Sequence, residues 1–273
     1  MIEKYTFKNK TAIITGGNAG IGRAVAFELA ERGGNLAIIG RNQTTIDEVC
    51  NELSAKYPNQ KITGYQLDVS DFSKISQTIK EIAGDHKNIG LLINNAGIAM
   101  GGKFEELSVD DIETVFDINF KSQIMMTKEV LPYLKQTKNS HIANVSSLFG
   151  IITPSGQSAY SASKFAVKGF SEVLRQELRP LGIGVSTIYP GGVKTNIAAN
   201  AKLGEGANKQ EIQKEAKSFE SNLTMTPEYA AKVIANGIEK RKVRILIGTT
   251  TKFLDFMTRL LPVKYEFLLK LVK

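Results

Sequence analysis

The sequence has little cysteine and histidine and no tryptophan. Cys50 is the single cysteine, so no disulfide can form within the chain, which suits a reducing compartment. The two histidines, His86 and His141, have no cysteine or histidine neighbour at the spacing of zinc ligands. We therefore expect neither a disulfide framework nor a metal site.

Long apolar runs are also missing. No segment approaches the roughly 18 uninterrupted apolar residues of a membrane-spanning helix, and the first ten residues lack the apolar core of a secretory signal. We expect a cytoplasmic protein. The net charge is +8, and the segment 239–273 alone holds nine Lys or Arg against three Asp or Glu. Because no nucleic-acid-binding motif accompanies this charge, we expect no nucleic-acid partner.

The chain does contain a regular alternation of short apolar runs and longer helical patterns. Such an alternation predicts a parallel sheet with helices on both faces. The runs that predict strands are 11–15, 35–40, 61–69, 89–97, 141–147, 183–191 and 243–248. The patterns that predict helices are 19–33, 44–56, 71–83, 108–135 and 158–181.

No linker interrupts this alternation over the 273 residues. We therefore expect one α/β domain of the Rossmann type, a doubly wound parallel sheet of about seven strands. The polar segment 195–222 is expected to be an insert that covers the substrate, and 249–273 to be a C-terminal amphipathic helix.

A glycine-rich segment, TGGNAGIG at 15–22, follows the first strand and opens the first helix. Gly16 and Gly20 permit a tight turn, and Gly22 lets the helix approach the sheet. The N–H groups at the helix start, with the positive end of its dipole, suit a pyrophosphate. A tight loop without a ligand is the alternative, but the flanking strand and helix favour the phosphate site.

The spacing T-G-x-x-x-G-x-G resembles that of the short-chain dehydrogenase/reductase family. Further motifs follow in the family's order, so that the resemblance spans about residues 8–250. It implies a nicotinamide cofactor, the strand order 3-2-1-4-5-6-7 and association into a homodimer or homotetramer through 108–135 and 158–181. These motifs are Asp68-Val69, N-N-A-G at 94–97, Asn119, Ser147, Y-S-A-S-K at 160–164 and Y-P-G-G-V-K-T at 189–195.

The Y-S-A-S-K motif places Tyr160 and Lys164 on one face of a helix, one turn apart. A nearby ammonium favours the phenolate and lowers the pKa of a phenol from its ordinary value near 10. The resemblance implies that Tyr160 is the acid/base and that Lys164 tunes it and holds the ribose. It also implies that Ser147, rather than Ser146, polarises the carbonyl, and that Asn119 holds a proton-relay water.

The end of the second strand favours NADP(H) over NAD(H). An NAD site places an acid where this chain has Gly40, and the fork of Arg41 can pair with a 2′-phosphate. The glycine loop, however, lacks the basic residue that many NADP-using members carry there. The other cofactor contacts expected from the motifs are Asn18, Ile21, Asn42, Asp68, Val69, Asn95, Ala96, Gly97, Pro190, Gly191, Val193 and Thr195.

The residues expected around the substrate are mostly apolar. This favours a lipophilic ketone, aldehyde or alcohol, such as a steroid, a retinoid or an acyl chain, although packing against the insert would explain the same pattern. A non-catalytic NADP(H)-binding regulator and an NADH-linked sugar or polyol dehydrogenase are the alternatives. The expected substrate contacts are Ser147, Phe149, Gln157, Tyr160 and Gly192.

The C-terminal segment 249–273 combines large apolar side chains with lysine and arginine. A packed helix or a dimer contact is the interpretation that we favour. Peripheral contact with an anionic membrane surface is the alternative.

Overall fold

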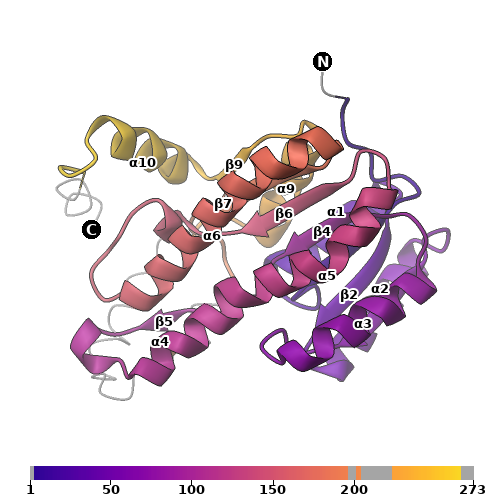
Figure 1. Ribbon diagram of the computed structural model, residues 1–273, viewed down its shortest axis with the longest axis horizontal. Helices are drawn as coiled ribbons and strands as arrows, with labels where there is room; N and C mark the ends of the chain where they lie inside the picture. Colours follow the sequence, from indigo (N-terminus) through magenta and orange to yellow (C-terminus); the bar gives the residue numbers. More distant parts are fainter. Residues whose placement is uncertain (1–2, 196–200, 204–222, 266–273) are drawn as a thin grey trace.

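The computed structural model describes residues 3–195, 201–203 and 223–265. Its main sheet has seven parallel strands in the order β3-β2-β1-β4-β6-β7-β9 (Figure 1), which confirms the predicted order. The strands are β1 (Thr11–Thr15), β2 (Asn35–Gly40), β3 (Ile62–Gln66), β4 (Ile89–Asn94), β6 (His141–Val145), β7 (Gly184–Pro190) and β9 (Arg244–Ile247). A second, two-stranded pairing joins β5 (Met100–Gly101) to β8 (Lys202–Leu203).

Helices cover both faces of the main sheet. α1, α2 and α9 share one apolar core with the strands, and α3, α5 and α6 share a second core on the opposite face. Figure 1 shows α5 and α6 crossing in front of the sheet. The helices are α1 (Gly20–Glu31), α2 (Gln43–Lys56), α3 (Phe72–Asp85), α4 (Val109–Phe116), α5 (Ser122–Gln136), α6 (Ser158–Leu178), α9 (Pro227–Glu239) and α10 (Thr249–Leu260).

The central strands β1, β4 and β6 are buried along their whole length because helices cover both faces of the sheet. In β1, Ala12 and Ile14 belong to one core, whereas Ile13 belongs to the other. Side chains alternate between the faces of a strand, so only a continuous apolar run can fill both layers. This explains why the strands were recognisable from short apolar runs.

The sheet reverses its direction of growth between β1 and β4. Strands β2 and β3 extend it to one side of β1, and β6, β7 and β9 extend it beyond β4. The loops that follow β1 and β4 therefore diverge from the carboxyl ends of these two strands. α/β sheets of this kind bind ligands at such a point. The residues that carry the predicted motifs lie at this edge.

The segment 108–135, predicted as one helix, is interrupted. Ser108 caps α4 by accepting a hydrogen bond from Asp111 N at 3.1 Å, as its capping pattern predicts. A π-helical turn, Asp117–Lys121, then separates α4 from α5. Asn119 lies within this turn and is fully buried. Single π turns inside helices frequently occur at functional sites.

Helix α9 was not predicted, although its start carries a recognisable signal. Thr226 accepts a hydrogen bond from Tyr229 N at 3.2 Å, and Pro227 occupies the first helical position. A capping threonine followed by proline is typical of a helix N-terminus. α9 covers the sheet beside α1.

The C-terminal helix is shorter than predicted. α10 ends at Leu260, and Leu261 has the non-helical angles φ −128° and ψ 67°. Pro262 follows, and a residue before proline is disfavoured in the helical region. The chain then makes a turn up to 265, while 266–273 and most of the predicted insert 195–222 lie outside the described residues. Among the described helices, none is long and apolar enough to cross a bilayer.

Candidate active site

The glycine-rich segment forms a cradle between β1 and α1. Gly16 and Gly20 have φ angles of +63° and +52°, a region that favours glycine. A Cβ on Gly22 would overlap the carbonyl oxygen of Gly16 and lie 2.6 Å from Asn95 Nδ2. These three positions therefore require the absence of a side chain, as the sequence predicts.

Asn95 holds the cradle in place from the end of β4. Its Nδ2 donates hydrogen bonds to the carbonyl oxygens of Thr15 (3.0 Å) and Gly16 (3.2 Å). In return, Thr15 Oγ1 accepts from Asn95 N at 2.9 Å and from Ala96 N at 3.0 Å. The loops after β1 and β4 are thus joined at the point where the sheet reverses. Thr15 was not predicted to have this role.

The N-terminus of α1 faces the cradle without a capping side chain. Ala19 occupies the capping position, and the first turn contains no acid. Thr195 lies beside it, since a Cβ on Gly20 would be 3.4 Å from Thr195 Cγ2. Uncapped N–H groups at the positive end of a helix can bind an anion such as a pyrophosphate.

The end of β2 has no room for an acid at position 40. A Cβ on Gly40 would lie 2.5 Å from Asn18 Oδ1, and Asn18 is fixed because its Nδ2 donates to Thr45 Oγ1 at 2.7 Å. Asn42 caps α2 by accepting from Thr45 N at 3.2 Å. Arg41 is exposed, and its guanidinium has no hydrogen-bond or ion-pair partner in the described part of the chain.

Asp68 and Val69 lie at the end of β3. Asp68 Oδ1 accepts hydrogen bonds from Ser70 N (2.9 Å) and Ser70 Oγ (2.7 Å). Val69 is buried. Asp71 occupies the capping position of α3, but its side chain accepts from Ser73 Oγ and not from a backbone N–H of the first turn.

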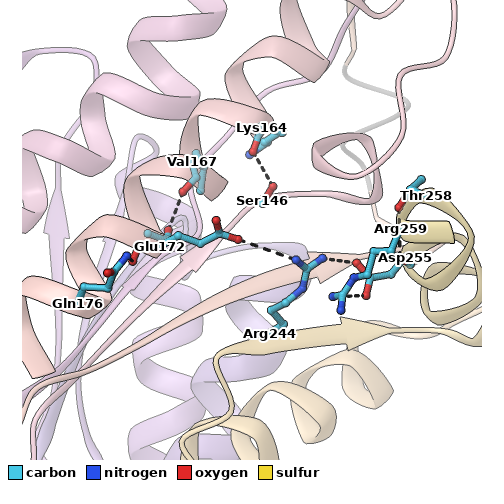
Figure 2. Close-up of polar contacts among 10 residues, drawn as sticks. Ser146, Lys164, Val167, Glu172, Gln176, Arg244, Asp255, Thr258 and Arg259 are labelled. Atoms are coloured by element: carbon cyan, nitrogen blue, oxygen red, sulfur yellow. Dashed lines mark hydrogen bonds and ion pairs between the residues drawn. The ribbon is translucent and has the colours of Figure 1, made fainter. Parts of the chain in front are cut away.

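The Ser147 side chain lies within hydrogen-bonding reach of the Tyr160 phenol, and its Oγ accepts a hydrogen bond from Phe149 N at 3.1 Å. Ser147 follows β6, and Tyr160 lies in the first turn of α6. The neighbouring Ser146 points elsewhere: its Oγ donates to the Lys164 carbonyl oxygen at 2.8 Å (Figure 2). The structure therefore brings Ser147, and not Ser146, to the tyrosine.

Burial raises the pKa of the Tyr160 phenol above its ordinary value, and the hydrogen bond with Ser147 opposes this shift. Lys164 lies on the same face of α6 as Tyr160, as their i, i+4 spacing predicts, with its Nζ 5.7 Å from the Tyr160 ring centroid. The amine donates a hydrogen bond to the Val145 carbonyl oxygen at 3.2 Å. Burial also lowers the Lys164 pKa to about 8, so the amine loses its proton in the weakly alkaline range.

Asn119 links the loop after β4 to α6. Its Oδ1 accepts from Ile98 N at 2.8 Å, and its Nδ2 donates to Ile98 O at 3.0 Å and to Ser163 Oγ at 3.2 Å. Gly97 lies close to both side chains, because a Cβ there would be 2.9 Å from Asn119 Oδ1 and 3.3 Å from Lys164 Nζ. Asn119, Lys164 and the end of β4 thus form one buried polar cluster.

The sequence is similar to those of known proteins. A sequence model described as short chain dehydrogenase matches residues 10–206. The chain is 35% identical to the protein SadH of Mycobacterium tuberculosis over 265 residues, which cover 96% of this chain and 94% of SadH. The chain belongs to the short chain dehydrogenase family.

Solved structures of this family share the fold. A short chain dehydrogenase/reductase from Burkholderia phymatum, in complex with NAD, has a TM-score of 0.84 at 25% identity and covers 93% of this chain and 94% of its own. A short chain dehydrogenase from Burkholderia cenocepacia, in complex with NADP, has a TM-score of 0.78 at 25% identity and covers 91% of this chain and 100% of its own. The two relatives hold different dinucleotides.

In this dehydrogenase, the residues that follow β7 lie against the start of α10 and position 225. A Cβ on Gly191 would overlap Thr251 Oγ1, and Val193 is buried and bridges to Met225. Pro190 ends β7, and Gly192 accepts a hydrogen bond from Met225 N at 3.0 Å. The segment 189–195 therefore runs from the sheet edge back to the glycine cradle at Thr195.

The predicted substrate residues of this dehydrogenase come from the segments after β6 and β7 and from the start of α6. Phe149 packs edge-on against the Tyr160 ring, with centroids 6.0 Å apart. Gln157 precedes α6 and bridges to Gly102. Two cavities of about 270 and 370 Å³ lie near the loop 151–158, but neither is lined by Tyr160 or Ser147.

Sequence reasoning missed one further residue of the polar cluster. Ser163 Oγ donates to the Tyr160 carbonyl oxygen at 2.7 Å and accepts from Asn119. It lies inside the Y-S-A-S-K motif, so its position was known, but only the tertiary contact with the π-helical turn indicates what it does.

Proposed function

We propose that this member of the short chain dehydrogenase family is an NADP(H)-dependent oxidoreductase that interconverts a ketone or aldehyde with an alcohol. The observation that carries the proposal is that Ser147 lies within hydrogen-bonding reach of Tyr160, whose ring centroid is 5.7 Å from the buried amine of Lys164. This pair stands at the same sheet edge as the glycine cradle. A hydroxyl pair beside a dinucleotide cradle suits hydride transfer coupled to proton transfer.

The residues present fit a nicotinamide dinucleotide. Gly16 and Gly20 adopt the positive φ angles of the tight turn, Gly22 lets the helix approach that turn, and the uncapped start of α1 suits the pyrophosphate. Gly97 has no side chain that would crowd the Lys164 amine, which would meet the ribose. The bound cofactor supplies or accepts the hydride.

The side chains handle the carbonyl oxygen and its proton. Ser147 donates a hydrogen bond to the substrate oxygen and stabilises the negative charge that develops there. Tyr160 Oη gives its proton to that oxygen during reduction and takes it back during oxidation. Lys164 positions the ribose and, when protonated, favours the phenolate. Asn119 holds the end of β4 and the water through which the proton reaches solvent.

NADP(H) is the proposed cofactor because the end of β2 disfavours NAD(H). Asn18 occupies the space that an acid at position 40 would need, so the usual partner of the free ribose hydroxyl groups cannot be placed there. Arg41 is exposed beside this position and lacks a protein partner among the described residues. A planar guanidinium can bind a 2′-phosphate through two hydrogen bonds.

The proposed substrate has a lipophilic body, such as a steroid, a retinoid or an acyl chain. Phe149 beside Tyr160 supports this, as do Leu148 and Ile151 of the same loop, which belong to an apolar cluster. A homodimer or homotetramer built through α4, α5 and α6 remains our expectation for the assembly.

The decisive experiment measures NADPH and NADH oxidation with a panel of lipophilic ketones and aldehydes and, separately, of sugars. We expect turnover with lipophilic carbonyls and NADPH, and loss of that turnover in Tyr160→Phe. Tight NADPH binding without turnover of any substrate would instead indicate a non-catalytic regulator. Turnover of sugars with NADH would indicate a polyol dehydrogenase.

A further inference from the structure

Helix α10 carries an apolar stripe that the described part of the chain leaves uncovered. Phe253, Phe256 and Leu260 are 51%, 59% and 58% exposed. Their i, i+3, i+7 spacing places them along one side of the helix. Single exposed apolar side chains are ordinary, but several large ones gathered on one helix face mark an interaction surface. These three residues are called the apolar stripe below.

The opposite side of α10 is firmly packed, so the stripe has a fixed direction. Leu254 is buried in a cluster with Ile151, Ile152 and Tyr189, and Thr251 is fully buried. After the helix, Tyr265 joins the same cluster, and its hydroxyl is hydrogen-bonded to Thr153 Oγ1 at 2.8 Å. Figure 1 shows α10 beyond the carboxyl end of β9, at the end of the sheet.

The acid of α10 is turned away from solvent. Asp255 is the single acidic residue between 249 and 265, and its side chain is 8% exposed. Figure 2 shows it between Arg244, with which it forms a short ion pair, and Arg259 at 2.8 Å. Arg244 also lies 3.9 Å from Glu172. Two acids and two arginines therefore neutralise one another at the base of the helix.

The remaining charges beside the stripe are positive. Lys252 lies on α10 and Lys264 follows it, and both are exposed. Neither has an ion-pair partner within the described ranges. The outer surface of α10 therefore combines large apolar side chains with uncompensated cations and presents no exposed acid.

This combination decides among the partners that could cover the stripe. In a two-fold contact with a second copy of the chain, each lysine would face the apolar stripe and lysines of the other copy. No exposed acid of α10 would neutralise its charge there. A nucleic acid would use the lysines but would leave two phenylalanines and a leucine in water. An anionic bilayer accepts both, with apolar side chains at the acyl boundary and lysines at the phosphates.

We propose that α10 is an interfacial helix that docks this protein onto an anionic lipid bilayer through the apolar stripe. The helix would lie in the plane of the membrane surface, with Lys252 and Lys264 directed toward lipid phosphates. The docking itself does not depend on the enzymatic activity. It would bring the loop 148–153, which packs on the inner side of α10, close to the membrane. A benefit to lipophilic substrates rests, in addition, on the proposed function.

The test is flotation of the full chain with vesicles of phosphatidylglycerol and phosphatidylcholine in equal parts, compared with phosphatidylcholine alone. We expect binding to the anionic vesicles that weakens with added salt. Phe253→Gln/Phe256→Gln should reduce this binding by at least about tenfold. The matched control is Val173→Gln/Leu181→Gln, since these apolar residues are 54% and 52% exposed elsewhere on the surface. It should bind like the unchanged chain. Circular dichroism melting verifies that each variant is folded.

Several results would overturn the proposal. The full chain could remain unbound by anionic vesicles, or the stripe variant and the control could bind equally well. Displacement from vesicles by mixed-sequence duplex DNA would assign the surface to nucleic acid. A dimer in sedimentation that only the stripe variant abolishes, without vesicle binding, would assign it to a second copy. Because vesicle binding is measured without substrate, these outcomes are independent of whether the chain turns over a ketone.

Discussion

Ser146 Oγ donates a hydrogen bond to the Lys164 carbonyl oxygen at 2.8 Å, and this bond distinguishes two adjacent serines. It fixes Ser146 to the backbone of α6, where it is buried. Ser147 is then free to form its hydrogen bond with Tyr160. The position of β6 against α6 thus decides which hydroxyl reaches the substrate.

Substitution of Ser147 by alanine should therefore affect mainly activity, and substitution of Ser146 mainly stability. We expect Ser147→Ala to lower kcat by about 100-fold, as for the loss of one oxyanion donor, with little change in melting temperature. Ser146→Ala should cost about 1 kcal/mol of unfolding free energy, because it leaves a buried carbonyl with one bond fewer, and should retain most activity. Steady-state kinetics and denaturant titration of both variants measure these effects. Equal losses of kcat would contradict the assignment.

The pH dependence of Ser147→Ala gives a separate test. The hydrogen bond with Ser147 lowers the Tyr160 pKa, so its removal should raise that pKa. In the direction of alcohol oxidation Tyr160 must accept a proton. The pH at which kcat/KM falls on the acid side should therefore move upward in the variant. An unchanged profile would mean that another group titrates.

Lys164 should make stability depend on pH in the alkaline range. Burial lowers its pKa to about 8 in the folded chain, from 10.5. The unfolded chain therefore binds more protons between these values, and stability rises with pH there. Below pH 8 the buried ammonium costs up to about 3 kcal/mol. We expect Lys164→Met to melt higher than the unchanged chain at pH 7, and the difference to shrink by about pH 10.

In the Lys164→Met variant, the Val145 carbonyl oxygen that the amine contacts keeps a hydrogen-bond partner. Gln123 Nε2 also donates to the Val145 carbonyl oxygen, at 3.3 Å. Melting is measured without cofactor, so that ribose binding does not contribute. A difference in melting temperature between the variant and the unchanged chain that stays constant from pH 7 to 10 would contradict this prediction. It would show that burial does not destabilise the charged form of Lys164. Activity of the variant should be lost at every pH.

Arg41→Gln should affect one cofactor only. Loss of a charged hydrogen bond costs about 1.5–3 kcal/mol, which predicts at least a tenfold lower kcat/KM with NADPH. The value with NADH should change less than about twofold, since NADH has no 2′-phosphate. Lys56→Gln, on the exposed last turn of α2, serves as a charge-matched control. Equal losses with both cofactors would remove Arg41 from the 2′-phosphate site.

Two glycine-to-alanine substitutions should change the stability of the chain in opposite directions. A Cβ at Gly22 would overlap the Gly16 carbonyl oxygen, so Gly22→Ala should displace the cradle, raise the KM for the cofactor by at least about tenfold and lower stability. Gly84 in α3 has no neighbouring atom within 4 Å of such a Cβ. Gly84→Ala should therefore stabilise the chain by up to about 1 kcal/mol. Cofactor titration and thermal melting compare the two.

Much of the fold could be predicted because its signals are local. Runs such as 36–39 and 91–93 are apolar without interruption, which is what a strand covered on both faces requires. α9 was missed although Thr226 and Pro227 mark its start. The π-helical turn at Asn119 could not be predicted, because its backbone depends on hydrogen bonds to Ile98 and Ser163, which are distant in sequence.

The sequence by itself determined the order of strands and helices, the glycine positions of the cradle and the one-turn spacing of Tyr160 and Lys164. Each of these follows from backbone periodicity or from the conformational freedom of glycine. Both are visible in residues that are close together in the sequence. Tertiary structure alone decided that Lys164 points to Val145, that Asn18 fills the space beside Gly40 and that the stripe of α10 faces outward. These depend on burial and on contacts between distant segments, and no local pattern encodes which groups packing will bring together.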